Sequence, residues 1–172
     1  MRIAVISDTH AGAPTPWMQA VYQAYLEPAD VLVHCGDMTG QALWSFFLQH
    51  PCFYAVAGNM CEWELSRELE QRVSFTAAGL TVGVVHGWGQ DRTGLSRKVA
   101  ESFGPGYDLI CFGHTHAPEW VRHGQAWVVN PGSLRESGSA PTLAYVHVAP
   151  DGGLTREAVA VPRVLGGARA AG

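Results

Sequence analysis

Short apolar runs alternate with segments of helical periodicity along the first half of the chain. The runs at residues 2–7, 31–35 and 53–57 are apolar and rich in β-branched or aromatic residues, and each is followed by an Asp, Gly-Asp or Gly-Asn turn. Such runs, bounded by turn residues, predict buried strands. Three other segments space their apolar residues as helices do and predict helices at residues 17–26, 41–49 and 62–71. The third of these segments is rich in charged residues, so we expect its helix to be exposed.

The second half of the chain is dominated by strands. Residues 73–77 and 80–85 flank a Gly-containing turn and predict a hairpin, and residues 95–103 predict a helix that Gly104-Pro105-Gly106 ends. The remaining predicted strands are residues 109–112, 119–122, 126–129, 142–148 and 154–161. Strands that alternate with helices and then follow one another predict one layered α/β domain over residues 1–165, a β-sandwich flanked by helices. The Gly/Ala-rich residues 166–172 are predicted to form a disordered tail.

Composition narrows the class of protein. The chain has 172 residues, of which 47% are hydrophobic and 15% charged, and its net charge is −4. No apolar run approaches the roughly 20 residues that span a bilayer, and the first residues lack a signal-peptide profile, so we expect a cytoplasmic protein without membrane partners. The absence of a Lys/Arg-rich run argues against a nucleic-acid partner. The four cysteines show no C-x-x-C spacing and predict neither a zinc ribbon nor a disulfide scaffold.

Polar residues follow five of the predicted strands, either directly or after a single glycine. Ligands of open α/β sheets bind at the carboxyl ends of strands, so we expect these side chains to converge at one edge. Two of them, in the stretch Cys-Phe-Gly-His-Thr-His, are separated by a single residue and therefore point to the same side. The candidate ligands are Asp8, His10, Asp37, Asn59, His86, His114 and His116.

A ligand set of Asp, Asn and His without cysteine suits Mn²⁺, which we expect first, and also iron, zinc or nickel, better than calcium. Seven ligands exceed what one tetrahedral ion needs, so the economical interpretation is two divalent ions per chain. Two ions about 3.5 to 4 Å apart can hold a phosphoryl group and generate hydroxide near neutral pH. The pattern therefore predicts the hydrolysis of a small phosphoester.

The motifs Asp8-x-His10, Gly36-Asp37, Gly58-Asn59, His86-Gly87 and Gly113-His114-x-His116 together resemble the calcineurin-like metallophosphoesterase superfamily, and most closely its small stand-alone phosphodiesterase branch. The resemblance covers residue 2 to about residue 161. It implies a β-sandwich of two mixed sheets flanked by helices, and phosphodiesterase activity. It also implies that Asp8, His10 and His116 hold one ion, that Asn59, His86 and His114 hold the other, and that Asp37 bridges them. Asn59 and His86 are in addition expected to take part in catalysis.

One departure from the superfamily pattern concerns the residue after Asn59. The commoner pattern has histidine there, followed by an acidic residue, whereas this chain has Met60 and Cys61. Methionine cannot donate a proton, and the small phosphodiesterase branch usually has cysteine directly after the asparagine. Cys61, displaced by one position, is either a weak acid or an ordinary exposed thiol, and we favour the second interpretation.

Several other residues keep two interpretations. The turn Asn130-Pro131-Gly132-Ser133 matches the same branch and either contacts the substrate or simply ends a strand. Three arginines either pair with a phosphate oxygen or are solvated surface charges: Arg135, Arg92 and Arg97. His34 is interpreted as a core histidine that supports the site rather than as a ligand.

Two other classes of function compete with the small-molecule enzyme. A protein-interaction scaffold of the retromer-subunit type uses the same fold, but the presence of all seven candidate ligand residues argues against a pure scaffold. A nuclease is opposed by 11 Lys/Arg residues against 15 acidic residues without a basic stripe. A homo-oligomer stays open, because Trp63, Trp88 and Trp120 could line a subunit contact or pack in the core.

Overall fold

The computed structural model describes residues 1–89, 91–138 and 140–164. The tail predicted at residues 166–172 lies outside this part. In chain order the elements are β1 (Arg2–Ile6), α1 (Pro16–Val21), the π-helix η1 (Tyr22–Leu26), β2 (Val31–His34), α2 (Gln41–Phe47), β3 (Phe53–Ala55), α3 (Trp63–Glu68), β4 (Arg72–Ala77), β5 (Leu80–Val85), α4 (Leu95–Phe103), β6 (Leu109–Cys111), β7 (Glu119–His123), β8 (Ala126–Asn130), β9 (Thr142–Val148) and β10 (Leu154–Ala160).

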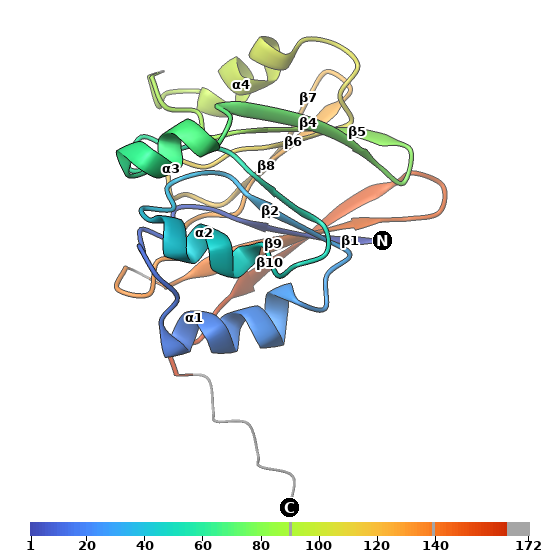
Figure 1. The fold of residues 1–172 in the computed structure, drawn as a ribbon. Helices are drawn as coiled ribbons and strands as arrows, with labels where there is room; N and C mark the ends of the chain where they lie inside the picture. Colours follow the sequence, from blue (N-terminus) through green and yellow to red (C-terminus); the bar gives the residue numbers. More distant parts are fainter. Residues whose placement is uncertain (90, 139, 165–172) are drawn as a thin grey trace, which may run out of the picture.

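Two five-stranded mixed sheets face each other (Figure 1). The first has the order β10-β9-β1-β2-β3, in which β1, β2 and β3 are parallel and β9 is antiparallel to both of its neighbours, β1 and β10. The second has the order β4-β5-β6-β8-β7, with β5, β6 and β8 parallel and an antiparallel strand at each edge. The predicted β-sandwich of two mixed sheets flanked by helices is therefore confirmed.

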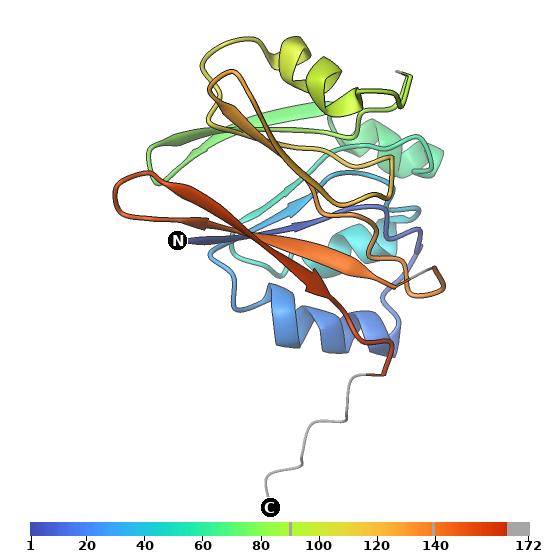
Figure 2. The same cartoon turned by 180° about the vertical axis from the view of Figure 1, so that it is seen from behind.

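Burial explains the layers. Side chains alternate between the two faces of a strand, so Ile3 and Val5 of β1 enter the core between the sheets, where they join Val82 and Val84 of β5. The other face of β1, with Ile6, packs under α1 and α2. Helix α4 covers the outer face of the second sheet, and Figure 2 shows α4 and α1 on opposite outer sides of the molecule. A strand covered on both faces must be apolar throughout, which is why β1 reads as a continuous apolar run.

The predicted helices exist, with two differences in detail. The helix predicted at 17–26 begins as α1 but continues as η1, where the Glu27 N–H bonds the Tyr22 carbonyl. The helix predicted at 62–71 ends at Glu68, because Leu69 is already extended and the Glu70 carbonyl accepts a hydrogen bond from Ala57 N–H beside β3. None of the helices in the described part of the chain combines the length and apolar composition that crossing a membrane requires.

The carboxyl ends of β1 and β2 lie at the left of Figure 1, and the polar loops gather there. Helix α3, the loop that follows β5 and the loop that follows β8 reach the same side from different sheets. The predicted convergence of post-strand residues is therefore a property of the whole fold rather than of one sheet.

Candidate metal centre

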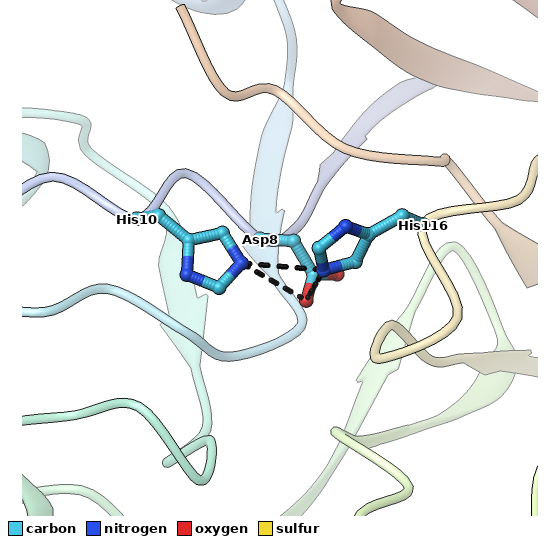
Figure 3. A group of neighbouring side chains, drawn as sticks. All are labelled: Asp8, His10 and His116. Carbon is cyan, nitrogen blue, oxygen red and sulfur yellow. Dashed lines mark hydrogen bonds and ion pairs between the residues drawn. The ribbon is translucent and has the colours of Figure 1, made fainter. Parts of the chain in front are cut away.

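Asp8, His10 and His116 form the first group of candidate ligands. Asp8 and His10 follow β1 and His116 follows β6, yet their ligand atoms lie within 4.8 Å of one another (Figure 3). Asp8 Oδ1 lies 3.1 Å from His116 Nε2 and 3.9 Å from His10 Nε2. The two imidazole nitrogens are 3.2 Å apart. Three ligand atoms that come together from two loops far apart in the sequence are the kind of geometry that a bound cation requires.

The carboxylate of Asp8 is buried and only half satisfied. Its Oδ2 accepts hydrogen bonds from Ser7 Oγ at 2.6 Å and from the His114 N–H at 3.0 Å. Its Oδ1 has no hydrogen-bond partner among the described residues, because the nearby His116 nitrogen lacks hydrogen-bond geometry. Burying an unsatisfied charged oxygen is costly, and a cation between Oδ1 and the histidine nitrogens removes that cost. The residues present therefore fit a divalent ion.

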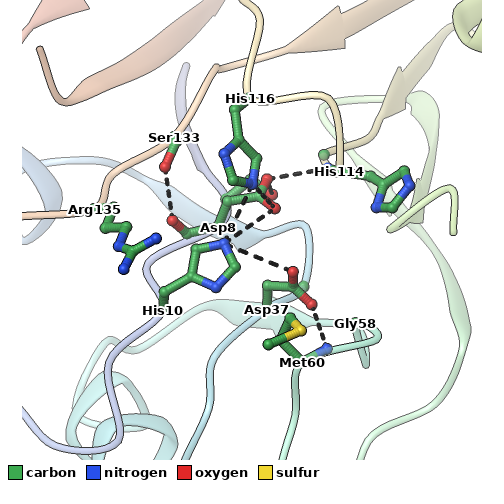
Figure 4. Close-up of polar contacts among 12 residues, drawn as sticks. Asp8, His10, Asp37, Gly58, Met60, His114, His116, Ser133 and Arg135 are labelled. Atoms are coloured by element: carbon green, nitrogen blue, oxygen red, sulfur yellow. Dashed lines mark hydrogen bonds and ion pairs between the residues drawn. The ribbon is translucent and has the colours of Figure 1, made fainter. Parts of the chain in front are cut away.

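Asp37 connects this group to a second one. Its Oδ1 accepts the Met60 N–H at 2.9 Å and lies 3.3 Å from His86 Nε2, and its Oδ2 lies 3.7 Å from His10 Nε2 (Figure 4). One carboxylate oxygen thus faces each group. Asp8 is shared as well, since its Oδ1 lies 4.0 Å from His86 Nε2 and Asp8, Asp37 and His86 form the second group. The sharing of Asp8 was not predicted from the sequence.

His86 is fully buried and held in one orientation. Its Nδ1 donates to the Cys35 carbonyl at 2.7 Å, so Nε2 is the nitrogen that faces Asp37 and, at 3.2 Å, Asn59 Oδ1. Burial lowers the pKa of His86, but the hydrogen bond to Asp37 and the negative charges of Asp37 and Asp8 outweigh burial and raise it. A metal ion that takes Nε2 must displace this proton, so ion binding strengthens as pH rises.

His114 stands apart from the other candidate ligands. Its backbone N–H holds Asp8, but its imidazole belongs to neither group and points away from Asp8 in Figure 4. The ring packs edge-on against His86, with centroids 5.2 Å apart. Desolvation, together with the positive charges of His86 and Arg92, lowers the pKa of His114. The role of His114 as a ligand of the second ion stays a prediction.

Backbone strain is concentrated at these loops. Among the described residues, six non-glycine residues have a positive φ, and only Ala78, in the hairpin turn, is outside the candidate set. Left-handed backbone is unfavourable for residues with a side chain, and it persists where surrounding structure enforces it, most often at functional sites. The other five are Asp8 (54°), His10 (47°), Asp37 (61°), His114 (69°) and His116 (59°).

Glycine is required where two of these loops touch. A Cβ on Gly58 would overlap the carboxylate and backbone nitrogen of Asp37. A Cβ on Gly36, which also has φ of +97°, would lie 2.7 Å from His86 Nδ1. The glycine before Asn59 therefore makes room for Asp37, and the glycine before Asp37 makes room for His86.

Gly58→Ala is expected to lower the free energy of unfolding by about 1 to 3 kcal/mol, the usual cost of overpacking, and to weaken metal binding by displacing Asp37. Urea denaturation of the metal-free protein measures the first effect and calorimetric titration with Mn²⁺ the second. Gly12→Ala is the matched control, because its Cβ would meet nothing closer than 3.8 Å. Equal stability of the two variants would contradict the assigned contact.

His34 lies behind the site, as the sequence predicted. Its Nδ1 accepts the Gly36 N–H at 3.2 Å, so its Nε2 carries the proton and donates to Thr9 Oγ1 at 3.1 Å. Thr9 in turn donates to the Asp37 carbonyl at 3.4 Å. Burial, with the positive charge of His86, lowers the pKa of His34 to about 3. A neutral His34 thus joins the Asp8 loop to the Asp37 loop.

This shift predicts a pH dependence of stability. The pKa of His34 is about 3 in the folded protein and about 6.5 in the unfolded chain, so the unfolded chain binds one more proton between these values. The contribution of neutral His34 to the free energy of unfolding is complete above pH 6.5 and falls as pH falls toward 3. At pH 4.5 the loss amounts to about 2 to 3 kcal/mol. Urea unfolding of metal-free wild type and His34→Gln at pH 7.5 and 4.5 should show a shallower loss in the variant. Parallel losses would refute the assignment.

The turn Asn130-Pro131-Gly132-Ser133 packs against the ligand loops. Asn130 Nδ2 donates to the Gly113 carbonyl at 2.9 Å, and Ser133 Oγ donates to the Asp8 carbonyl at 2.8 Å. The turn therefore ties the loop that carries His116 to the loop that carries Asp8. The hydroxyls of Ser7 and Thr9 were missed by the sequence analysis. The only signal was their position on either side of Asp8.

The three candidate arginines differ in their surroundings. Arg135 is exposed and lies beside His10 in Figure 4. Burial is the largest cause that lowers the pKa of His10; Asp37 and Asp8 oppose it, while the positive charges of His116 and Arg135 add to it. Arg92 lies near enough to His114 for its positive charge to help lower the pKa of that imidazole. Arg97 is 75% exposed and pairs with Glu101 on the surface of α4, so it is a solvated surface charge.

Cys61 faces its own loop. Its Sγ accepts the Gly58 N–H at 3.2 Å, and burial raises the pKa of the thiol. A thiol with a raised pKa is predominantly protonated near neutral pH, but this one is engaged with the turn that carries Asn59. Met60, in contrast, has a side chain that is 52% exposed. The thiol is therefore partly buried and bonded to the turn, so the interpretation of Cys61 as an ordinary exposed thiol is wrong about its exposure. Its role as a weak acid stays an untested hypothesis.

Comparison with known sequences shows the family of the chain. The sequence profile of the calcineurin-like phosphoesterase superfamily domain matches residues 1–151. The chain is similar to YsnB of Bacillus subtilis, a probable metallophosphoesterase, with 29% identity over 142 residues that make up 78% of this chain and 76% of YsnB.

Solved structures agree at the level of the fold. An archaeal phosphodiesterase has a TM-score of 0.68 at 20% identity, covering 92% of this chain and all of its own. Vps29 of Entamoeba histolytica, solved in complex with Zn²⁺, has a TM-score of 0.67 at 20% identity, covering 93% of this chain and 99% of its own. Because the profile matches most of the sequence, the chain belongs to the calcineurin-like phosphoesterase superfamily.

Proposed function

We propose that this protein is a phosphodiesterase that hydrolyses small phosphodiesters with two divalent metal ions, Mn²⁺ first among them and iron, zinc or nickel as alternatives. One observation carries the proposal: the buried Asp8 Oδ1, without a hydrogen bond among the described residues, faces histidine nitrogens of both ligand groups. Asp37 supports it by presenting one oxygen to each group.

The assignment of ligands follows the sequence prediction. Asp8, His10 and His116 would hold one ion, Asn59, His86 and His114 the other, and Asp37 would bridge them. Bound there, the two ions would supply a hydroxide nucleophile at neutral pH and neutralise charge on the phosphate.

The surrounding residues position the ligands. Ser7 Oγ and the His114 N–H fix Asp8, and the Cys35 carbonyl fixes the ring of His86. Hydrogen bonds of this kind set the orientation and basicity of metal ligands. Arg135, beside His10, offers a guanidinium group to a phosphate oxygen.

The phosphodiester preference and the cytoplasmic location are proposals as well. The archaeal phosphodiesterase with the same fold supports the first. A panel of aryl and natural phosphodiesters, phosphomonoesters, nucleotides and DNA, assayed with each ion and with a chelator, tests the activity. We expect diester hydrolysis that the chelator abolishes; DNA cleavage would favour the nuclease alternative.

A scaffold function is the second candidate, favoured by the likeness of the fold to Vps29. A scaffold would bind proteins through this fold without hydrolysing the diesters of the panel. The presence of all the candidate ligand types argues for the enzyme. Metal binding by itself does not separate the two candidates, so hydrolysis is the deciding measurement.

Saturating Mn²⁺ is expected to raise the melting temperature of wild type by about 5 to 10 °C. Ligand at 100 times its Kd adds about 2.7 kcal/mol of stability, and 1 kcal/mol corresponds to about 2 to 4 °C for a chain of this size. The double variant His86→Ala, His116→Ala should show little shift, because each substitution removes a nitrogen from one group. His147→Ala is the control, since His147 bonds Glu157 on the surface of β9 and β10. An unshifted wild type would contradict the metal centre.

A further inference from the structure

Two exposed apolar side chains border the candidate metal centre. Trp88 follows His86 by two residues and is 47% exposed, and Met60 directly follows Asn59 and is 52% exposed. Single exposed apolar side chains are common at protein surfaces, but apolar surface beside a polar site marks a binding surface. We call Met60 and Trp88 together the apolar rim.

Contacts join the loop of Trp88 to the segment that pairs with the Asn59 loop. Its indole Nε1 donates to Gln71 Oε1 at 3.0 Å. The residue before Gln71 is Glu70, whose carbonyl accepts a hydrogen bond from the N–H of Ala57 at 2.8 Å. Ala57 lies two residues before Asn59. The indole therefore extends from the loop of His86 toward the segment that lies along the loop of Asn59. Its hydrogen bond fixes the ring and leaves much of it exposed.

Met60 lies closer still to the candidate ligands. Its backbone N–H donates to Asp37 Oδ1 at 2.9 Å, and Figure 4 shows its thioether beside Asp37. Arg135 reaches the site from a different loop, next to His10. The surroundings of the centre are thus divided between cations, with Arg135 near His10 and Arg92 near His114, and apolar surface on the loops of Asn59 and His86. A phosphate and an apolar substituent of one molecule match this division.

We infer that the apolar rim binds an aromatic ester group of the phosphodiester substrate. The indole of Trp88 offers a face for stacking, and the flexible, polarizable thioether of Met60 adapts to the edge of a ring. This inference rests on the proposed function and adds the class of substrate to it. A phosphodiester with an aromatic or nucleobase-bearing substituent is bound more tightly than one with only small alkyl groups.

Two phosphonates that the enzyme cannot cleave test the inference by binding alone. Phenylphosphonate and methylphosphonate carry the same acidic group and differ in the ring, so calorimetric titration of the Mn²⁺-loaded protein isolates the contribution of the rim. We expect phenylphosphonate to bind about five- to tenfold more tightly. Trp88→Ala should reduce this ratio to about twofold without changing the affinity for methylphosphonate, and Trp88→Phe should retain most of it because an aromatic face remains.

Trp63→Ala is the matched control. Trp63 is 75% exposed at the start of α3, and the guanidinium of Arg67 lies 5.8 Å from the centre of its ring. Its removal should leave the phosphonate ratio unchanged. Equal binding of both phosphonates by wild type, or an unchanged ratio in Trp88→Ala, would overturn the inference and point to a protein partner for the rim. Failure of wild type to bind either phosphonate, or to hydrolyse any diester, would instead contradict the proposed function.

Discussion

Asp37→Ala is expected to lower phosphodiester hydrolysis more than about 10²-fold. Replacing a residue that only hydrogen-bonds a metal ligand typically costs 10- to 100-fold in activity or metal affinity, and Asp37 faces both groups directly, through Oδ2 toward His10 and Oδ1 toward His86. Its loss also leaves the repulsion between two positive ions less compensated. Steady-state rates with Mn²⁺, together with metal content per chain, measure the effect.

Two further variants make this result specific. His114→Ala should cost less, because the imidazole of His114 lies outside both groups and is predicted to touch one ion only. Asp151→Ala removes an exposed carboxylate in the turn between β9 and β10 and should leave activity unchanged. Full activity of Asp37→Ala, or of metal-free wild type, would show that the two-ion interpretation is wrong.

The second large effect concerns the leaving group. We expect aryl phosphodiesters to be hydrolysed readily and alkyl phosphodiesters slowly, because Met60 occupies the position where the superfamily commonly has histidine. A general acid contributes about 10² to 10⁴ in rate, and an alkoxide needs it more than an aryl oxide of pKa about 7, which is a better leaving group than the tyrosine phenol near 10. Met60→His should accelerate the alkyl substrates and barely change kcat for the aryl ones.

The structure sharpens the design of this experiment. The contact of Met60 with Asp37 is made by the backbone N–H, so the substitution keeps it. Since Met60 also belongs to the apolar rim, its loss should raise KM for aryl diesters, and kcat and KM must be measured separately. Cys61→Ala should leave both kcat values unchanged, because the thiol faces Gly58. Similar rates of wild type on alkyl and aryl diesters would reveal another proton donor.

The predicted strands agree with the observed ones to within one or two residues at most ends. β9, for example, is predicted and observed at residues 142–148. Agreement is good because strands buried on both faces leave continuous apolar runs that turn residues interrupt. The helix predicted at 62–71 was too long, because among the residues of α3 only Leu65 is buried and its end depends on Glu70 pairing beside β3. The order of the strands in each sheet could not be predicted from local sequence pattern, because β1 pairs with β9, which comes from the far end of the chain.

The sequence by itself determined which residues can serve the centre, because parallel strands bring whatever follows their carboxyl ends to one edge. It could not determine where each side chain points, because that depends on χ angles, loop strain and contacts between segments far apart in the chain. Only the tertiary structure placed Asp8 in both groups, turned the imidazole of His114 aside and directed the Cys61 thiol to its own loop. Only the fold, likewise, brought the indole of Trp88 to Gln71, which joins the loop after β5 to the segment before β4.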